Sequence, residues 1–576
     1  MCGIIGYVGK ENAFSLVVEG LKNLEYRGYD SYGVVYNDED NLGFLKEVGK
    51  VSGLSNQRFV SNTAIGHTRW ATHGSVTREN AHPHFDCNNK ISVVHNGIIE
   101  NYEELKKDLI NKGHVFKSDT DSEVVPHLIE EELKKGIVFE EACKSVFLKL
   151  EGSFAILVLK KGEDKIYGVR KDSPLVLGIS DNGFFAASDA PAFLKHTKKV
   201  IWLYNYDFFI LSEGGWSILN LKENKVMNRV VDFIDWDVES VKKGEFKHFM
   251  LKEILEQVQV LKNISKRKDF EQSASLLKSA DKVLLIGSGT SYHACLSAEY
   301  LLIGKGVDAR AIQSSEFSNY VNLINENTLV VAVSQSGETA DVLEAVKIAK
   351  NKKAKVLSLV NVKGSSLERV SDKVLLLNAG PEICVLSTKS YTSQVALLVL
   401  IFQLAFGGED NLNLVWNELY NLTSKLERKR IEVIADKIKD AKVIVIIGRN
   451  EHYVTALEAG LKIREVSYIP VLSFAGGELK HGNIALIEKG TPCIVFGDDK
   501  QTLSNAVEMK SRGGWIIGVS EKNQEVFDDW IKVFNVGVFN PVMFIVPAQI
   551  LAYYIAVLKG LDPDKPRNLA KSVTVK

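Results

Sequence analysis

Cys2 places a thiol next to the start of the chain, where an amine can serve as its base. A small side chain at this position permits removal of Met1, and the thiol and a free α-amine would then belong to one residue. The α-amine titrates at about 7.7 to 8.0 and can take the thiol proton directly or through a water molecule. This is the chemistry of an N-terminal nucleophile, whereas the structural alternative is an ordinary small apolar residue in a strand.

Four polar segments follow Cys2 and could supply its partners. They are residues 67–74 (HTRWATHG), 80–84 (NAHPH), 95–97 (HNG) and 118–121 (SDTD). Taken singly, an Arg-Trp pair is usually a packed surface pair, and an Asn-Gly pair is more often a hairpin turn. Together with CGI at 2–4 and YRGYDS at 26–31, the four segments resemble the glutaminase domain of the N-terminal-nucleophile amidotransferases, over about residues 2–235.

The resemblance implies a glutamine pocket around Arg69. The guanidinium group would pair bidentately with the α-carboxylate of glutamine, and Asp121 would bind the α-ammonium group. His82 matches a loop histidine that helps to close this pocket, and Trp70 matches a residue that gates the transfer of ammonia.

Asn96 and Gly97 match the pair that stabilises the tetrahedral intermediate in this family. The side-chain amide of Asn96 and the backbone N–H of Gly97 would donate to the oxyanion that forms when Cys2 attacks glutamine. Each such donor is typically worth about 3 kcal/mol.

A group of possible metal ligands lies in the same part of the sequence, formed by His82, His84, Asp86 and Cys87. Its His-x-His spacing is not one of the usual zinc signatures, so the sequence predicts no metal site. The reaction implied by the resemblance also requires no metal and no organic cofactor.

Two serine-rich turns follow predicted strands in the second part of the chain. Residues 287–291 (GSGTS) imitate the start of a dinucleotide fingerprint, but Tyr292 stands where its third glycine would be. Residues 334–339 (SQSGET) follow the next predicted strand. Hydroxyls and backbone N–H groups at a helix N-terminus can bind phosphate, although a single turn of this kind is more often a helix cap.

These turns resemble those of sugar isomerase domains, which bind phosphosugars, and the two repeats resemble the tandem pair of the glutamine:fructose-6-phosphate amidotransferases. The most specific further segments are 387–389 (STK), 461–465 (LKIRE), 477–482 (GELKHG) and 566–575 (PRNLAKSVTV). The resemblance now spans essentially the whole chain. The sugar-phosphate-binding residues that it implies are Thr290, Ser291, Ser334, Gln335, Ser336, Thr339 and Ala570.

The resemblance also assigns the sugar chemistry. His481 matches a histidine that opens cyclic fructose 6-phosphate, a task suited to proton exchange near neutral pH. Lys571 matches the lysine that forms a Schiff base with the open-chain ketone. Glu465 matches the carboxylate that moves a proton from carbon 1 to carbon 2, and Lys462 would assist it from the same helix face. From spacing alone, Lys462 and Glu465 would be a surface ion pair, and Lys571 a solvated lysine in a tail.

Short β-like runs punctuated by glycine dominate about the first 235 residues, and helical spacing occurs at 100–112 and 121–135. The runs are residues 3–8, 92–99, 154–159, 165–169 and 208–211. This pattern predicts an α+β domain with packed sheets. The resemblance implies the four-layer αββα architecture of N-terminal-nucleophile domains.

The second part of the chain contains an internal duplication of strand positions. Apolar runs begin near Val283, Val330, Val356 and Val374, and again near Val443, Cys493, Trp515 and Val533. The gaps are about 47, 26 and 18 residues in the first set and about 50, 22 and 18 in the second. Such runs, separated by helical lengths, predict two doubly wound parallel α/β domains. The predicted organisation is a glutaminase domain 2–236, a linker 237–250, sugar isomerase domains 251–425 and 426–560, and a catalytic tail 561–576.

Composition excludes several classes of protein. The 71 basic and 72 acidic side chains give a formal charge of −1, which supports neither a disordered chain nor a nucleic-acid binder. Six cysteines without a CxxC pair indicate a reducing compartment, and no secretory signal opens the chain, so a cytoplasmic protein is expected. The apolar runs 395–406 and 542–558 are short for a membrane span and are interpreted as buried helices.

The sequence therefore predicts an amidotransferase that acts on glutamine and fructose 6-phosphate, without nucleic-acid or membrane partners. The resemblance implies a homodimer, in which His481 reaches a site completed by the neighbouring subunit. One alternative is another amidotransferase with the same glutaminase head, of the phosphoribosyl or asparagine-forming type. A second is a regulatory protein that senses phosphosugars without turnover, which would have no need for Cys2, Arg69 and Asp121 together.

Overall fold

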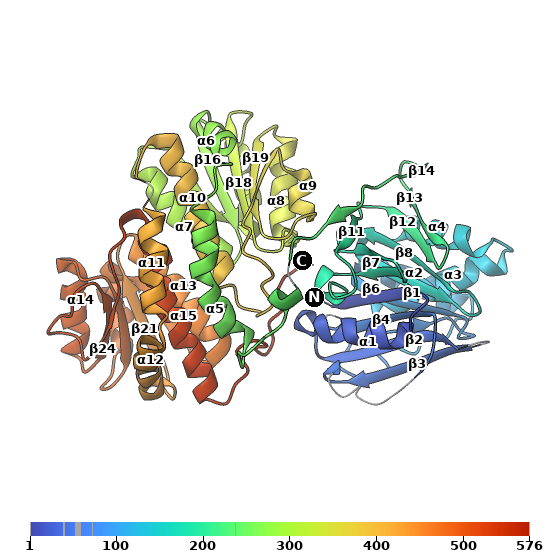
Figure 1. Ribbon diagram of the computed structural model, residues 1–576, viewed down its shortest axis with the longest axis horizontal. Coiled ribbons are helices and arrows are strands. Elements are labelled where there is room, and N and C mark those ends of the chain that lie inside the picture. Colours follow the sequence, from blue (N-terminus) through green and yellow to red (C-terminus); the bar gives the residue numbers. More distant parts are fainter. Residues whose placement is uncertain are drawn as a thin grey trace. The chain divides into compact units, whose positions relative to one another are not determined.

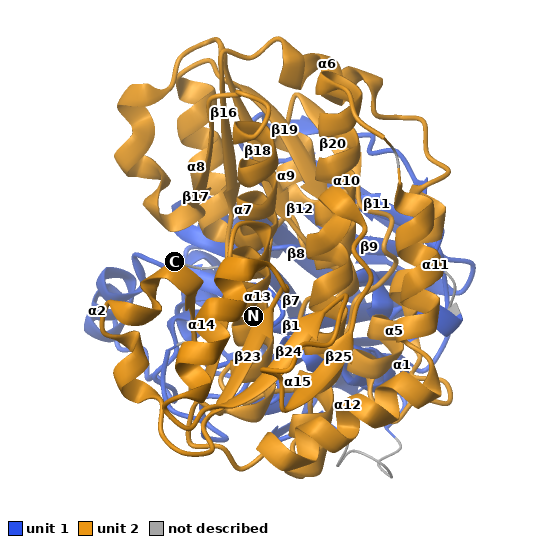
Figure 2. Ribbon diagram, turned by 90° about the vertical axis from the view of Figure 1, so that its left-hand side faces the viewer, with its two compact units in different colours: residues 1–241, 570–576 blue, residues 242–569 orange. Residues whose placement is uncertain are grey.

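The computed structural model describes residues 2–38, 41–51, 59–71, 73–236, 238–409 and 411–574. The chain forms two compact units (Figures 1 and 2). The first comprises Met1–Val241 together with Ala570–Lys576, and the second comprises Lys242–Leu569.

Two antiparallel sheets form the centre of the first unit. The eight-stranded sheet has the order β15 (Asp232–Phe233), β11 (Lys199–Trp202), β9 (Val176–Ser180), β10 (Gly183–Ala187), β1 (Gly3–Gly9), β4 (Thr63–Arg69), β2 (Ser31–Asp38) and β3 (Asn41–Val48). The seven-stranded sheet has the order β14 (Lys225–Val226), β13 (Gly215–Asn220), β12 (Asp207–Ser212), β8 (Lys165–Lys171), β7 (Gly152–Lys160), β6 (Ile91–Ile99) and β5 (His84–Phe85).

Helices cover the outer faces of both sheets, so this unit has the predicted αββα layers (Figure 1). The helix α1 (Ala13–Asn23) packs on β1, β4 and β2, whereas α3 (Val124–Lys134) and α4 (Phe139–Lys149) pack on the seven-stranded sheet, with α2 (Tyr102–Asn111) beside α3. Side chains of both sheets, among them Ile4 and Leu157, form the core between the sheets. Every residue of β1 is buried because the strand is covered on both faces.

The second unit contains two five-stranded parallel sheets with one topology. The first has the order β17 (Ala309–Gln313), β16 (Lys282–Gly287), β18 (Thr328–Ser334), β19 (Lys355–Val360) and β20 (Lys373–Leu376). The second has the order β22 (Val471–Ala475), β21 (Ile444–Gly448), β23 (Pro492–Phe496), β24 (Trp515–Ser520) and β25 (Asp529–Lys532). Both have the doubly wound strand order 2-1-3-4-5, in which ligands bind beyond the carboxyl ends of the first and third strands.

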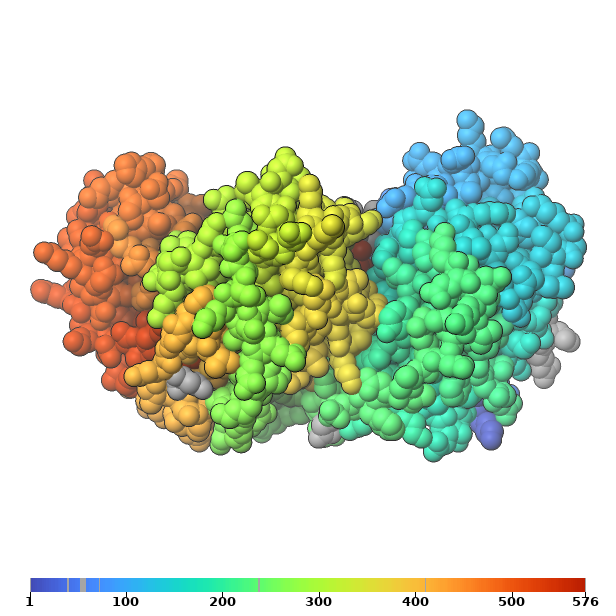
Figure 3. All heavy atoms as spheres, turned by 90° about the horizontal axis from the view of Figure 1, so that it is seen from above, coloured from blue at the N-terminus to red at the C-terminus, as the bar shows by residue number. Residues whose placement is uncertain are grey.

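Helices bury both faces of these sheets. In β16, Leu285 faces the large core shared by the two halves, while Leu284 faces a separate core on the other side. The helices of the first half are α5 (Phe249–Ile264), α6 (Glu271–Lys278), α7 (Thr290–Ile303), α8 (Ala340–Asn351), α9 (Ser366–Val370) and α10 (Lys389–Phe406). Those of the second are α11 (Leu412–Leu422), α12 (Lys425–Ile438), α13 (Glu451–Ser467), α14 (Lys500–Lys510) and α15 (Asn540–Leu558). In the space-filling view, the two halves are the green-to-yellow and orange-to-red parts of the unit (Figure 3).

In the second unit, the predicted strand positions are mostly confirmed, with three errors. Val533 was expected to begin a strand, but β25 ends at Lys532, so this prediction is wrong. The prediction also lacked β17 and β22, which lie at the edges of their sheets. Each is only partly buried, and residues such as Arg310 interrupt the apolar pattern that marks a central strand.

The two apolar runs lie in α10 and α15. By length and composition alone, the segments Lys389–Phe406 and Gly537–Leu558 could each cross a membrane. In the structure, 83% of an apolar 18-residue stretch in each segment is buried inside the protein, where both helices contribute to the core shared by the two halves. These burial values support their interpretation as core helices.

Candidate active site

Cys2 immediately precedes β1, beside the end of the neighbouring strand β4. The backbone N–H of Trp70 donates to Cys2 Sγ over 3.2 Å, and the side-chain amide of Asn96 donates to the Cys2 carbonyl oxygen over 2.9 Å. Burial raises the pKa of the Cys2 thiol, while the Trp70 N–H and the positive charge of Arg69 act in the opposite direction. Because the protonated thiol is favoured, attack on a substrate requires a base such as an α-amine.

The sequence Asn96-Gly97 lies within β6 and is not a hairpin turn. Gly97 has a φ of +127°, and a Cβ at this position would lie 2.0 Å from the carbonyl oxygen of Ser153. The backbone therefore requires glycine at 97, and the preceding Asn96 lies next to Cys2.

Arg69 ends β4, and its buried guanidinium group organises the loop that follows. It donates to the carbonyl oxygens of His73, Gly74 and Ser75, the last over 3.0 Å. Asp121, which begins a short 3-10 helix (Asp121–Glu123), is also buried and accepts from the Ile99 N–H over 2.8 Å. Arg69 and Asp121 belong to separate elements of the first unit. Burial lowers the pKa of Arg69, and nearby negative charges, among them Asp30 and Asp121, act in the opposite direction.

Replacing Arg69 with lysine is expected to raise the KM for glutamine about 10- to 100-fold, because one ammonium group cannot reproduce a bidentate carboxylate contact. Steady-state glutaminase kinetics measure this change. The matched control is Arg78→Lys, since the Arg78 side chain is 64% exposed, and its KM should stay unchanged. An equal KM in Arg69→Lys and the parent chain would contradict the assignment.

His82 packs among buried histidines beside Asn96. Its ring stacks on His67 with centroids 4.0 Å apart, and its Nδ1 accepts from the backbone N–H of His95 over 3.2 Å. Burial lowers the pKa of His82 well below its usual value and that of His67 to about 3. These rings are therefore neutral, and His82 positions β6 through a hydrogen bond.

The four possible metal ligands of the His82–Cys87 segment point to different partners. His84 Nε2 lies 3.0 Å from Thr120 Oγ1, and Asp86 accepts from the N–H groups of Lys90 and Ile91. His82, His84 and Asp86 therefore bond to separate partners. Cys87 lies close to His114, His127 and Glu130, which belong to other segments.

The two serine-rich turns follow β16 and β18, which are adjacent strands. In the first, Gln394 donates to Ser291 Oγ over 3.0 Å. In the second, Ser334 Oγ accepts from the Gly337 N–H over 3.0 Å and lies 3.4 Å from Thr339 Oγ1. The Ser336 hydroxyl accepts from the N–H of the residue two positions later, and Gln335 accepts through its backbone oxygen from Asn361. The two turns thus bring hydroxyl groups together at the carboxyl ends of β16 and β18, where phosphate binding was predicted.

Lys462 lies on α13 with its side chain 1% exposed, so the surface ion pair offered as its structural alternative is wrong. Its ammonium group is 2.7 Å from Glu465 Oε2, 3.5 Å from Glu458 Oε1 and 3.0 Å from Thr290 Oγ1. Burial acts to lower the pKa of Lys462, but the two carboxylates raise it above its usual value. The lysine is therefore charged and favours the ionised form of Glu465.

Glu458 and His293 were missed by the sequence analysis. Glu458 is fully buried, and its carboxylate lies 2.6 Å from His293 Nδ1 and accepts from the Thr290 hydroxyl over 3.0 Å. It therefore joins α13 to α7. The available signal was its position four residues before Lys462, on the same face of the helix.

Replacing Glu458 with glutamine is expected to lower the free energy of unfolding by about 3 kcal/mol, because the buried Lys462 charge loses one of its two carboxylates. Denaturant unfolding measures this change. Glu451→Gln, at a half-buried position in the first turn of the same helix, is the control and should cost less than about 1 kcal/mol. Equal losses in the two variants would contradict a special role for Glu458.

Three predicted site residues, His481, Ala570 and Lys571, lie outside α13, later in the sequence than Lys462 and Glu465. His481 is exposed and ends the 3-10 helix Gly476–Lys480 of the second unit. Ala570 and Lys571 are half-buried and are grouped with the first unit.

Comparisons with known proteins cover both units. A glutamine amidotransferase domain model matches residues 67–195, and a SIS domain model matches 276–404 and 437–528. The chain is 44% identical over 602 residues to the glutamine–fructose-6-phosphate aminotransferase (isomerizing) of Thermococcus kodakarensis and 43% identical over 600 to that of Pyrococcus horikoshii, with 100% of each chain covered.

A solved structure is also similar to this chain. It is the C-terminal domain of glucosamine-fructose-6-phosphate aminotransferase from Francisella tularensis, with 31% identity and a TM-score of 0.51, covering 56% of this chain and 99% of that one. With the full-length relatives, this similarity shows that the chain belongs to the glutamine–fructose-6-phosphate aminotransferase (isomerizing) family.

Proposed function

We propose that this protein converts glutamine and fructose 6-phosphate into glutamate and glucosamine 6-phosphate. The observation that carries the proposal is the position of the Cys2 thiol, which accepts from Trp70 N–H beside the side-chain amide of Asn96. A second unit with two parallel sheets and hydroxyl-rich turns supports a phosphosugar as the acceptor of nitrogen.

Glutamine hydrolysis proceeds through a thioester. The α-amine of the mature chain takes the thiol proton, and the sulfur of Cys2 attacks the side-chain amide carbon of glutamine. Asn96 and the Gly97 N–H stabilise the oxyanion. The intermediate then collapses as the amide nitrogen takes the proton back from the α-ammonium group and leaves as ammonia, which forms the thioester. Water then hydrolyses the thioester to glutamate and restores the thiol, while ammonia passes Trp70 to the sugar site.

The sugar half of the reaction begins when His481 opens the ring of fructose 6-phosphate. The amine of Lys571 condenses with the ketone and releases water, and ammonia then replaces the lysine in the imine. Glu465 moves a proton from carbon 1 to carbon 2, which gives the 2-amino aldose. The charge of Lys462, 2.7 Å from Glu465, supports this role because it favours the carboxylate that must act as a base.

The enzyme is proposed to act in the cytoplasm as a homodimer. The exposure of His481 supports an arrangement in which this histidine completes the sugar site of the partner subunit. The absence of CxxC pairs in the sequence supports a reducing compartment.

Amide-labelled glutamine tests the proposed function. With [¹⁵N-amide]glutamine and fructose 6-phosphate, we expect glutamate and ¹⁵N-labelled glucosamine 6-phosphate in equal amounts, measured by mass spectrometry. Glutamate without labelled amino sugar would indicate an amidotransferase with another acceptor. Binding of fructose 6-phosphate without glutamate release would indicate a phosphosugar-sensing protein, and either result would contradict the proposal.

A further inference from the structure

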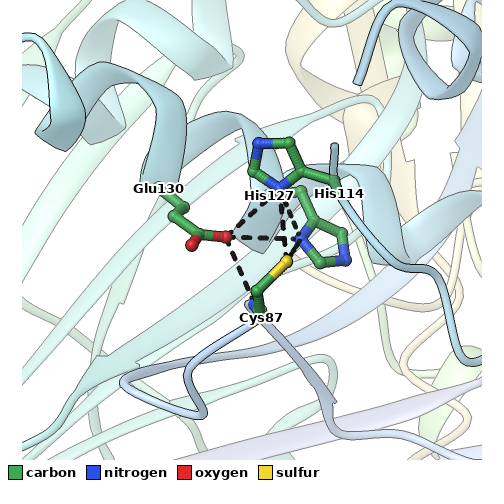
Figure 4. Close-up of side chains that lie close together, drawn as sticks. All are labelled: Cys87, His114, His127 and Glu130. Atoms are coloured by element: carbon green, nitrogen blue, oxygen red, sulfur yellow. Dashed lines mark hydrogen bonds and ion pairs between the residues drawn. The ribbon is translucent and has the colours of Figure 1, made fainter. Parts of the chain in front are cut away.

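Four potential metal ligands converge in the first unit, away from Cys2 in the sequence (Figure 4). Cys87 lies in the turn between β5 and β6, and His114 follows α2. His127 and Glu130 lie three residues apart on α3, so they share one face of the helix. Their ligand atoms all lie within 4.8 Å of one another.

The spacing of these atoms is close to that of a tetrahedral metal site. The Nδ1 atoms of His114 and His127 are 3.0 Å apart, and Cys87 Sγ is 3.5 and 3.6 Å from them. Glu130 Oε2 is 3.2 and 3.5 Å from the same two nitrogens. Ligand distances of about 2.0–2.3 Å around tetrahedral Zn²⁺ separate the ligand atoms by about 3.3–3.6 Å.

The outer nitrogens of both histidines face carboxylates. His114 Nε2 lies 2.7 Å from Glu131 Oε1, and His127 Nε2 lies 3.7 Å from Glu123 Oε1. Lys134 Nζ is 3.3 Å from the same His114 nitrogen but pairs more closely with Glu131, over 2.7 Å. The Nδ1 atoms of the two rings face each other across 3.0 Å, so one cation between them can bind both. A carboxylate beside the outer nitrogen of a metal-binding histidine is the usual outer shell of zinc sites.

The ligands are also held in place and accessible from one side. The N–H of Cys87 donates to Glu130 Oε2 over 3.2 Å, and Asn88 donates to the other oxygen over 3.0 Å. The side chains of His114 and His127 are 0% and 1% exposed, whereas Cys87 is exposed. A metal ion can therefore enter at Cys87 and meet two buried imidazoles.

We propose that Cys87, His114, His127 and Glu130 bind one Zn²⁺ ion in a tetrahedral structural site. A thiolate, two imidazoles and a carboxylate suit Zn²⁺, and four protein ligands close the coordination sphere, as in structural rather than catalytic sites. The Cys87 thiol releases its proton to solvent when the metal binds. This proposal departs from the sequence-based expectation of no metal, because spacings of 27, 13 and 3 residues between the ligands match no short signature.

The site would connect three segments, two of which adjoin residues of the proposed glutamine pocket in the chain. The turn that carries Cys87 follows His82 and His84, and α3 follows the 3-10 helix Asp121–Glu123 directly. A bound ion would thus tie the start of β6 to the helix next to Asp121. Its loss should lower the thermal stability of this unit.

Cobalt binding to the full-length protein tests the site. After removal of metal with a chelator, titration with Co²⁺ should give one ion per chain, the intense visible bands of tetrahedral cobalt and a thiolate-to-cobalt charge-transfer band. Zn²⁺ should displace the cobalt, abolish these bands and raise the melting temperature of the metal-free protein. Failure to bind Co²⁺ in a one-to-one ratio would overturn the proposal.

Variants identify the ligands. Cys87→Ser, at the exposed side of the site, should lose the charge-transfer band and bind Co²⁺ at least about tenfold more weakly. His127→Gln should lose tetrahedral binding, and Cys87→Ser remains informative if this buried change prevents folding. The matched control is Cys2→Ala, which removes another thiol of the same unit and should keep both the band and the stoichiometry. A band that persists in Cys87→Ser or disappears in Cys2→Ala would exclude Cys87 as the ligand.

Discussion

Replacing Cys2 with alanine is expected to reduce glutamate release about 10⁴-fold or more, because the variant lacks the only atom proposed to attack the amide. Isomerisation of fructose 6-phosphate without glutamine should continue at the parent rate, since its proposed groups lie far from position 2 in the chain. Glutamate formation and phosphosugar isomerisation, measured on one preparation, check both expectations.

The isomerisation assay is the internal control for folding of the Cys2→Ala chain. Glutamate release at the parent rate would remove Cys2 as the nucleophile. Mass spectrometry of the parent after reaction with an electrophilic glutamine analogue provides a second measurement. We expect a chain without Met1 that carries one label on Cys2, and active protein that retains Met1 would contradict the use of the Cys2 α-amine as the base.

Much of the fold could be predicted because its signals are local. The strands β6 and β7 and the helix α2 have apolar patterns that a single segment reveals, and the structure places them within a few residues of the predictions. The strands β17 and β22 could not be predicted in this way, because an edge strand buries fewer of its residues. The four-layer arrangement of the first unit came from resemblance rather than from any local pattern.

The candidate sites show the same division between local and long-range signals. The environment of Cys2 depends on β1, β4 and β6, which only the resemblance could bring together. The burial of Lys462 was not visible from the sequence, because its Lys-x-x-Glu spacing is equally typical of a solvated helix face.

The convergence of Cys87, His114 and His127 was invisible for a related reason. These residues come from a turn, a loop and a helix, and the distances between their atoms arise only from tertiary packing. Short spacing in the sequence favours His82 and His84 as a metal pair instead, but these histidines bond to other residues in the structure.

Replacing Lys571 with alanine is expected to eliminate formation of amino sugar, with a loss of at least about 10³-fold, because the methyl group cannot form an imine with the ketone. Glutamine hydrolysis at Cys2 should survive, so glutamate would accumulate without product. Borohydride reduction in the presence of fructose 6-phosphate distinguishes loss of the covalent step from loss of binding. The parent chain should gain one reduced sugar-phosphate adduct on Lys571, and the variant should gain none.

The control for Lys571→Ala is Lys559→Ala, which changes an exposed lysine just after the end of α15. This variant should retain both product formation and trapping, because the Lys559 ammonium group donates to the backbone carbonyl of Lys439 and has no proposed role in the sugar site. Trapping in Lys571→Ala, or normal turnover by it, would assign the Schiff base to another amine. Glu465 is assigned both by its motif and by its contact with the buried charge of Lys462. Lys571 is assigned by its motif alone, so this experiment tests the step of the mechanism that depends most on resemblance.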